Sequence, residues 1–318
     1  MCAGDTSRIR LGTGVISLPY HNPLTVADRV VQVDHQSQGR AMFGFGPGLL
    51  PSDAKMLGIP STEQRNRLAE GLAVVLRLIA GETVTQSSSW FDLSEARLQI
   101  GPHTHPRPEI VVASAITPSG GLLAGRHGLG LLCVAASSTP GYDVLDVNWQ
   151  VANDVAAEYD HVMDRSALRL VAPGHVAETR DQAIAEITDG FHRWDSHMRD
   201  VIEGGGEILG LGSMEQLLAG GAIVGSIDDA VESLESYWEK SGGFGAILYQ
   251  LTPWASEEDQ RRSLKRFAEE VMPRFTGRSR LRHASLARST RDKDELSARA
   301  KAGAEKAILE HFQPAGEA

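Results

Sequence analysis

The sequence predicts an α/β protein whose parallel strands form a TIM-type (β/α)8 barrel. Short β-rich runs alternate with stretches of helical periodicity from about residue 8 to residue 273. The runs are almost continuously apolar, as parallel strands buried on both faces are. An open doubly wound sheet has the same alternation but requires a dinucleotide fingerprint. The candidate for one, Gly44–Gly48, is poor because Pro47 removes an N–H from the loop and residues 49–51 are not expected to open a helix.

Six strands and seven helices follow from this pattern. The strands are expected near Arg8–Val15, Arg40–Gly46, Glu109–Ser114, Gly130–Ala135, Leu170–Val176 and Ala246–Gln250. The helices are expected at Pro23–Gln38, Ser61–Ala80, Ser119–His127, Gly141–Met163, Thr179–Asp200, Ser226–Lys240 and Ser256–Val271. At the start of the second helix, Ser61-Thr62-Glu63-Gln64 matches a capping box.

Composition shifts place the domain limits at residues 1–274 and 275–318. Within the first domain, residues 81–101 read as a hairpin-like insertion, and the Gly-rich residues 201–221 as a mobile lid. The region after 274 is polar, and Arg274–Lys301 holds nine Lys or Arg and three Asp or Glu. We interpret it as a solvated, partly helical extension or an oligomer arm, with an anionic partner as the alternative.

The overall composition excludes several classes of protein. Hydrophobic residues at 42% and charged residues at 23% are ordinary globular values. A net charge of −10 argues against a nucleic-acid or membrane-surface partner. Two cysteines, Cys2 and Cys133, make neither a disulfide framework nor a metal cluster. The first residues have no signal-peptide core, and no apolar run reaches the roughly 20 residues of a membrane helix. A cytoplasmic protein is expected.

Four blocks of the sequence carry recognisable motifs. Gly12–Gly48 combines a Gly-Thr dipeptide at a strand end, an Asn-Pro turn and a helix that ends in Val33–Arg40 (VDHQSQGR). Arg65–Glu70, Ala113–Gly128 and Val224–Asp229 follow in order. Together these blocks resemble the bacterial luciferase-like flavin-dependent monooxygenases, and within them the limonene monooxygenase-like branch. The resemblance covers about residues 8 to 273.

The resemblance implies a luciferase-like (β/α)8 barrel, in which the first strand of this chain is third in the family's order. The chain is therefore expected to lack the first two strand–helix units and to hold six strands. A barrel with two strands absent exposes two parallel edges. The family's first strand also contributes to the active site, so we assign no catalytic residue.

The end of the first strand is the expected flavin surface. Thr13, Gly14 and Val15 lie there, and small residues let a flat ring approach the backbone. The resemblance implies a non-proline cis peptide between Gly14 and Val15, under the isoalloxazine ring. The alternative is an ordinary strand end in which glycine serves packing.

The start of the helix after the third strand is the expected phosphate site. Ser114, Thr117, Ser119 and Gly120 combine hydroxyls with a helix N-terminus, which suits a phosphate. In the family this segment holds the FMN phosphate. The alternative for Thr117 and Ser119 is simple helix capping.

Other candidates lie outside these two segments. Arg65 or Arg67 matches the family's phosphate-side arginine, and a surface charge is the alternative. Gly225 and Ser226 also begin a helix, where capping with acidic residues is the alternative. His21 is expected to fix its loop, and a metal site is not expected at His103 and His105, which lack a third ligand nearby in sequence.

The resemblance implies a monooxygenase that inserts one oxygen atom of O2 into a small hydrophobic substrate, such as a terpene, through a C4a-(hydro)peroxyflavin. Reduced FMN is the expected cofactor, with FAD as the alternative, and NAD(P)H supplies electrons through a separate flavin reductase. Val15, Phe43, Phe45 and Ile116 are expected to line an apolar pocket. A homo-oligomer is expected. The rival functions are a deazaflavin-dependent dehydrogenase on the same fold and a non-catalytic flavoprotein or partner subunit.

Overall fold

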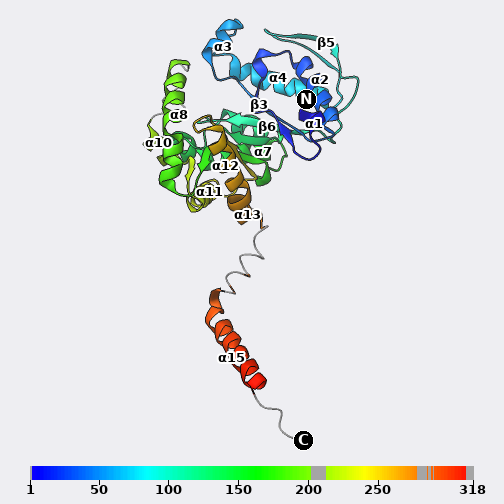
Figure 1. Ribbon diagram of the computed structural model, residues 1–318. Helices are drawn as coiled ribbons and strands as arrows, with labels where there is room; N and C mark the ends of the chain where they lie inside the picture. The colour runs from blue at the N-terminus through cyan, green and yellow to red at the C-terminus, as the bar shows by residue number, and fades with distance from the viewer. Residues whose placement is uncertain (1, 202–212, 278–284, 286–287, 289, 313–318) are drawn as a thin grey trace. The chain divides into compact units, whose positions relative to one another are not determined.

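A computed structural model of the chain describes residues 2–201, 213–277, 285, 288 and 290–312. The chain divides into a larger unit that ends at Ser263 and a smaller unit that starts at Leu264 (Figure 1). The sequence places the domain limit after residue 274, and that limit stays a prediction. No helix within the described ranges has both the length and the apolar character to cross a membrane.

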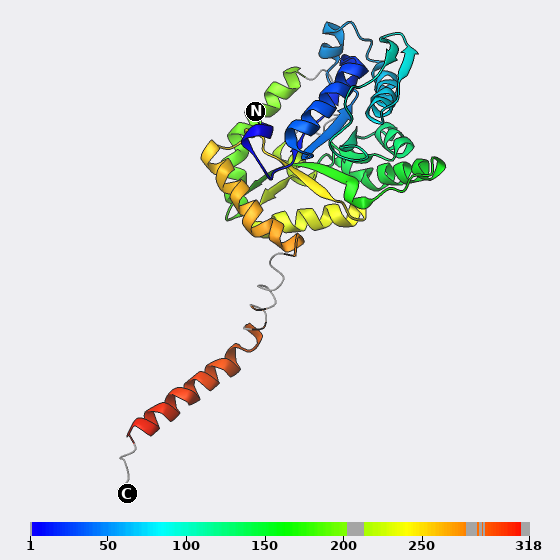
Figure 2. The ribbon, with the colours of Figure 1, turned by 90° about the vertical axis from the view of Figure 1, so that its right-hand side faces the viewer.

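One parallel sheet forms the centre of the larger unit (Figure 2). Its strands are β1 (Leu11–Gly12), β2 (Ile16–Ser17), β3 (Ala41–Gly46), β6 (Glu109–Ser114), β7 (Gly130–Cys133), β8 (Leu168–Val176), β9 (Ile223–Gly225) and β10 (Ala246–Gln250). Six of them lie in the order β1-β3-β6-β7-β8-β10, while β2 pairs with β3 and β9 with β8. The predicted fold class is confirmed, because the six strands form a half-barrel of the TIM type.

The first strand differs from its prediction, since residues 13–15 interrupt it between β1 and β2. Thr13 N–H still donates to Met42 O at 3.2 Å. Its hydroxyl oxygen then accepts the N–H of Gly44 at 2.9 Å, so a side chain takes a place in the ladder. Strand β9 was not predicted, because three residues are too short to stand out as an apolar run.

Helices lie around the sheet (Figures 1 and 2). In the larger unit they are α1 (Cys2–Asp5), α2 (Pro23–Ser37), α3 (Pro51–Met56), α4 (Gln64–Ile79), α5 (Ser119–His127), α6 (Thr139–Asp143), α7 (Leu145–Glu158), α8 (Arg180–Val201), α10 (Met214–Ala219), α11 (Ile227–Ser241) and the start of α12 (Glu257–Arg266). A π-helical turn (Phe267–Val271), α13 (Met272–Phe275) and α15 (Lys293–Phe312) follow in the smaller unit.

Two local predictions about helix starts are wrong. Residues 49–51 do open a helix, because Pro51 stands at the first position of α3, where its missing N–H costs nothing. The capping box at Ser61–Gln64 does not form, since α4 begins one residue after Glu63 and has no side-chain cap. Glu63 pairs with Arg67 instead.

The motif Val33–Arg40 at the end of α2 connects this helix to two other segments of the chain. Asp34 is fully buried and accepts hydrogen bonds from Thr104 N–H and from the Thr104 hydroxyl, both at 2.8 Å. Arg40 donates to Ser37 O at 2.9 Å and to Ala3 O at 2.7 Å. The block that carries much of the resemblance therefore holds the first residues and a distant loop against the helix end.

The two interrupting segments differ in what the structure describes. Residues 81–101 contain an antiparallel hairpin of β4 (Val84–Ser87) and β5 (Asp92–Ala96). Trp90 at its tip donates to Glu70 of α4 at 2.8 Å, which fixes the hairpin to that helix. Of the predicted lid, residues 202–212 lie outside the described residues, and α10 occupies most of the rest.

Candidate functional site

Most of the predicted site residues lie at one edge of the sheet. All its strands run parallel, so their carboxyl ends share that edge, where barrel enzymes place their chemistry. Thr13–Val15 precede the last residues of the split first strand, Ser114 ends β6 and Gly225 ends β9. The first turn of α4 joins them, because Gln64 donates to Pro47 O at 3.1 Å, just beyond the end of β3.

The segment Thr13–Val15 lies flat against two glycines of β3. A Cβ at Gly44 would stand 2.8 Å from Gly14 O, and one at Gly46 would stand 3.2 Å from a methyl group of Val15. Glycine is therefore required in β3 for this close approach. A Cβ added at Gly14 would meet no atom within 4 Å, and Val15 is 40% exposed. The segment thus offers a small, open backbone surface.

The peptide bond between Gly14 and Val15 is trans, which corrects the cis bond implied by the resemblance. Within the described ranges, the bond recorded as cis is His105–Pro106. The local geometry of residues 13–15 is held by the hydrogen bond between Thr13 and Gly44.

The start of α5 has hydrogen-bond donors to spare. Pro118 is its N-cap residue and makes no side-chain cap, and the Leu122 N–H donates to Pro118 O at 2.9 Å. The N–H groups of residues 119–121 precede that bond and have no acceptor among the described residues. Within the described part of the chain, the hydroxyls of Thr117 and Ser119 bond only to each other, at 3.0 Å. Thr117 and Ser119 therefore do not cap α5, contrary to the alternative considered from the sequence.

Ser114 and Gly120 have packing roles at the same helix start. Ser114 is buried, and its hydroxyl donates weakly to Thr117 O at 3.4 Å. A Cβ at Gly120 would stand 2.5 Å from Ala113 O, so only glycine lets α5 approach the end of β6 this closely. These two residues position the helix start, while Thr117 and Ser119 supply its hydroxyls.

The two candidate arginines of α4 are in different states. Arg65 is exposed and has no hydrogen bond or ion pair within the described chain. Arg67 is only 15% exposed, donates to Glu63 at 2.8 Å and 3.1 Å, and lies 5.7 Å from the centre of the Trp90 ring. Arg67 is therefore engaged in packing, and Arg65 has the free guanidinium.

A polar link near these arginines was not foreseen from the sequence. Gln64 donates to the Tyr20 hydroxyl at 2.8 Å as well as to Pro47 O, which ties α4 to the segment after β2. Burial raises the pKa of Tyr20, and the charge of Asp53 raises it further. The hydrogen bond with Gln64 acts in the opposite direction and lowers that pKa. No sequence signal pairs residues 44 positions apart.

The start of α11 is closed by its own residues. Asp229 accepts from Ser226 N–H at 2.8 Å and from the Ser226 hydroxyl at 2.6 Å, which completes a capping box. Arg180 adds an ion pair to Asp229 at 2.9 Å. Burial alone would raise the pKa of Asp229, but the bonds from Ser226 and Arg180 outweigh it and hold that pKa below its usual range. The carboxylate therefore accepts the two donors of Ser226 that would otherwise be open to a phosphate.

The structure brings together two of the predicted groups and separates the third. Strands β3 and β6 are neighbours, and Ala113 lies 3.5 Å from a Cβ built at Gly46, so Thr13–Val15 lie near the start of α5. Gly225 and Ser226 follow β9, which pairs with β8, two strands beyond β6.

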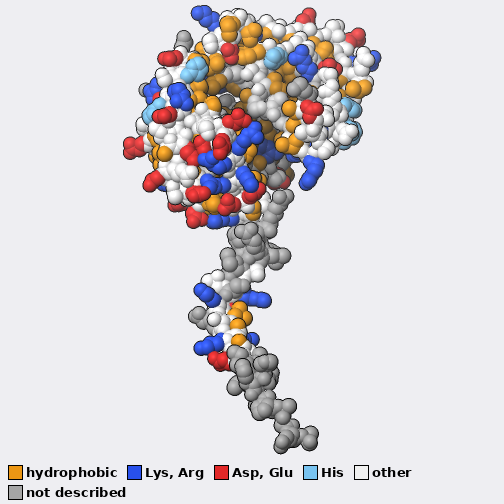
Figure 3. All heavy atoms as spheres, in the orientation of Figure 1, with side chains coloured by type: hydrophobic (Ala, Val, Ile, Leu, Met, Phe, Trp, Pro, Cys, Tyr) orange, Lys and Arg blue, Asp and Glu red, His pale blue; other side chains and the backbone are white. Residues whose placement is uncertain are grey.

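The expected apolar lining is partly wrong. Phe43 and Phe45 are buried, and they alternate with Gly44 and Gly46, whose faces meet residues 13–15. Alternate residues of a strand point to opposite faces, so both phenylalanines point away from the candidate site. Exposed apolar side chains lie instead on and beside α3, at Leu49, Met56 and Leu57. Figure 3 shows hydrophobic side chains in this region and charged ones over α12.

The histidines singled out in the sequence do not converge. His21 is exposed beside the helix start at Asn22. His103 packs edge-on against His35, with ring centres 5.6 Å apart. Across the described residues, no group of three or more His, Cys, Asp or Glu side chains is placed to hold a metal ion.

Comparison with known proteins agrees with the fold. The family model for luciferase-like monooxygenases matches residues 1–245. The chain is 40% identical to limonene 1,2-monooxygenase of Rhodococcus erythropolis, over 86% of this chain and 71% of that protein. It is also 40% identical to 4-hydroxyprotoasukamycin monooxygenase of Streptomyces nodosus subsp. asukaensis, over 86% of this chain and 76% of that one.

A solved structure shows the same fold. The oxygenating constituent of 3,6-diketocamphane monooxygenase of Pseudomonas putida, a type II Baeyer-Villiger monooxygenase in complex with FMN, has a TM-score of 0.69 and 22% identity. The match covers 85% of this chain and 81% of that one. The family model and the two relatives show that the chain belongs to the luciferase-like monooxygenase family of flavin-dependent enzymes.

Proposed function

We propose that the protein is a monooxygenase that binds FMN with its phosphate at the start of α5 and its ring over residues 13–15. The observation that carries this proposal is the open start of α5. Three backbone N–H groups and the hydroxyls of Thr117 and Ser119 make no cap there. The relatives named as monooxygenases and the FMN bound by the Pseudomonas putida protein support the same assignment.

The residues fit an FMN phosphate. A phosphate is well bound by free N–H groups at a helix N-terminus, which also carries a positive partial charge. Arg65 would add charge-assisted bonds, since its guanidinium has no partner within the described chain. Gly225 and Ser226 fit less well, because Asp229 already occupies the start of α11.

The residues near Gly14 would orient the ring and exclude water. The open surface at Gly14 leaves room for a planar ring, and Val15 adds an apolar contact. The exposed apolar side chains around α3 lie after the end of β3, where a small hydrophobic substrate such as a terpene would enter. Reduced FMN, when bound, would supply two electrons and two protons, so that one oxygen atom of O2 goes to the substrate and the other leaves as water.

A separate reductase would supply the reduced flavin from NAD(P)H. The Pseudomonas putida relative is described as an oxygenating constituent, which supports a division of labour between two proteins. A homo-oligomer and the oxygen-transfer route implied by the resemblance stay part of this proposal.

The test compares cofactors first and products second. FMN, FAD and a deazaflavin are titrated into the purified protein, and FMN is expected to bind most tightly. The protein is then supplied with NAD(P)H, a flavin reductase, limonene and 18O2, and one 18O atom is expected in the product. Tightest binding of the deazaflavin would favour the dehydrogenase alternative. FMN binding without any oxygenated product from a panel of terpenes would favour a non-catalytic flavoprotein.

A further inference from the structure

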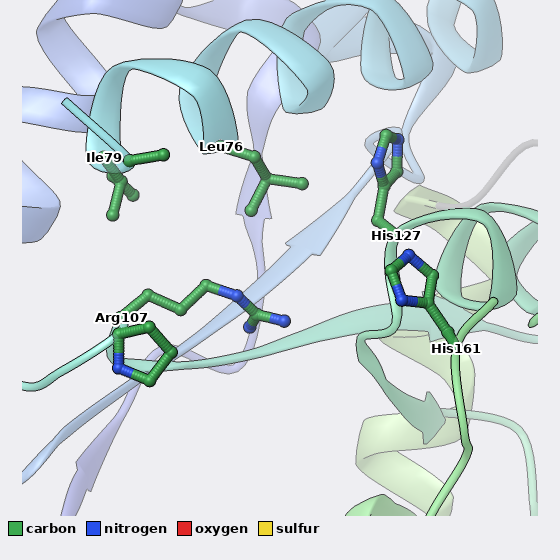
Figure 4. A pocket seen from close by; sticks show the side chains of 7 residues that line it. Leu76, Ile79, Arg107, His127 and His161 are labelled. Atoms are coloured by element: carbon green, nitrogen blue, oxygen red, sulfur yellow. The ribbon is translucent and has the colours of Figure 1, made fainter. Parts of the chain in front are cut away.

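A cavity lies at the other end of the strands from the candidate flavin site (Figure 4). Its volume is about 290 Å³, near the lower limit for small-molecule pockets. One wall is apolar and comes mostly from the last turn of α4, with Leu76, Ile79 and Ala80. The opposite wall is basic, with Arg107, His127 and His161. The two walls thus differ sharply in chemistry.

The basic wall is built at the amino-terminal ends of three neighbouring strands. Arg107 precedes β6, His127 ends α5 just before β7, and His161 lies in the connection to β8. In Figure 4 the guanidinium of Arg107 extends beneath Leu76 toward the two imidazole rings. Three groups that donate hydrogen bonds or carry positive charge therefore face one space.

Arg107 has bonding capacity left over. One of its terminal nitrogens donates to Gly128 O at 3.0 Å, at the carboxyl end of α5. A guanidinium has five N–H groups, and this is the one bond it makes within the described chain. Arg107 therefore uses a single N–H group to bind the carboxyl end of α5. The remaining donors are available to a second acceptor.

The cavity has an uncompensated positive character. None of its lining residues is acidic. Burial lowers the pKa of His127, and the neighbouring Arg126, His161 and Arg107 lower it further. Every charged group that shifts this histidine is thus basic. An anion placed between Arg107 and the histidines would relieve this repulsion.

We propose that this cavity binds a small organic monocarboxylate, with the carboxylate on Arg107 and the histidines and an apolar body against Leu76, Ile79 and Ala80. A planar carboxylate matches the fork of a guanidinium. The apolar wall has no partner for an inorganic anion, so an organic body is required. The site is separate from the flavin site, since β6 spans six residues, or about 20 Å, between them.

Isothermal titration with benzoate tests the proposal, and benzamide serves as the neutral ligand of the same shape. Benzoate is expected to bind the wild type at least tenfold more tightly than benzamide. Arg107→Gln, which keeps a donor for Gly128 O, is expected to lose at least tenfold in benzoate affinity. Ala80→Phe places a ring in the cavity from an exposed position and removes no charge. It is also expected to lose at least tenfold in benzoate affinity.

Arg126→Gln is the matched control. Arg126 is the neighbour of His127 in α5 but bonds the Tyr159 hydroxyl and does not line the cavity. Because the charge of Arg126 is exposed and screened by solvent, this variant is expected to lose less than about twofold in benzoate affinity. FMN affinity is expected to be unchanged in all three variants, which separates this proposal from the proposed function. The proposal is overturned if the wild type does not bind benzoate, if benzamide or inorganic phosphate binds equally well, or if both cavity variants retain wild-type affinity.

Discussion

Two helices of this protein begin just after a parallel strand, and their starts are in opposite states. At α11, Ser226 and Asp229 satisfy each other and Arg180 neutralises the carboxylate. At α5, Ser119 and Thr117 have hydroxyls in the same region but leave the backbone donors free. The difference lies three residues after the N-cap, where α11 has an aspartate and α5 has Gly121. An acid at that position closes a helix start, and a glycine leaves it open to an external anion.

A substitution that pushes α5 away from β6 should disrupt the proposed phosphate site at the start of α5. Gly120→Ala would place a Cβ 2.5 Å from Ala113 O and 2.8 Å from Ser114 Cβ, a clash with backbone that cannot rotate away. We expect it to lower the free energy of unfolding by about 3 kcal/mol and to weaken FMN binding as well. Urea denaturation measures the first effect. Gly303→Ala in α15, where a Cβ meets nothing, should be neutral or stabilising.

The two arginines of α4 should separate binding from stability. Arg65→Ala should weaken FMN binding by about 2 kcal/mol, or roughly 30-fold, because it removes a charge-assisted bond to phosphate. Its unfolding free energy should not change, since the side chain is exposed. Arg67→Ala should instead lower stability, because it removes the contacts with Glu63 and Trp90. Fluorescence titration measures FMN affinity and urea denaturation measures stability. Weaker FMN binding in Arg67→Ala, with unchanged FMN binding in Arg65→Ala, would make Arg67 the phosphate-binding arginine.

Removing the cap of α11 should affect stability alone. Ser226→Ala takes away the hydroxyl that accepts the Asp229 N–H, so unfolding should become easier by about 1 kcal/mol. FMN affinity should stay at the wild-type value, because this helix start is filled by Asp229. A loss of FMN affinity in the properly folded variant would mean that α11 also contacts the cofactor.

The smallest expected effect is a pH dependence at the same cap. The folded-state pKa of Asp229 is lowered, so its contribution to stability is present above the ordinary aspartate pKa and is lost as the pH falls through the folded value. Asp229→Asn should therefore be less stable than the wild type at pH 7. The difference in unfolding free energy between the wild type and Asp229→Asn should become smaller below about pH 4. Urea denaturation at both pH values measures it, and a gap that widens in acid would contradict the assignment.

Much of the fold could be predicted because buried parallel strands appear in the sequence as apolar runs. The start of α3 at Pro51 was missed although proline favours that position. The split of the first strand could not be foreseen, since it depends on Thr13 accepting from Gly44, 31 residues away. Such long-range bonds leave no periodic trace in the sequence.

The sequence could predict some of the local contacts around the candidate site and not others. The acid at position 229 was visible, and so was Glu63 four residues before Arg67, the spacing of a helical ion pair. The Trp90 contact that also holds Arg67 comes from a distant hairpin and was not visible. Phe43 and Phe45 were misplaced although their alternation with Gly44 and Gly46 puts them on the other face.

The most direct test of the open start of α5 is a comparison of FMN with riboflavin, which lacks the phosphate. Affinities are measured by fluorescence titration for the wild type and for Ser119→Asp, which gives α5 an acid of its own. The wild type should prefer FMN by at least tenfold. Ser119→Asp should abolish that preference while its riboflavin affinity and its stability stay unchanged, since an acid in the first turn suits a helix. Equal wild-type affinities for the two flavins, or an undiminished preference in Ser119→Asp, would contradict a phosphate at this helix start.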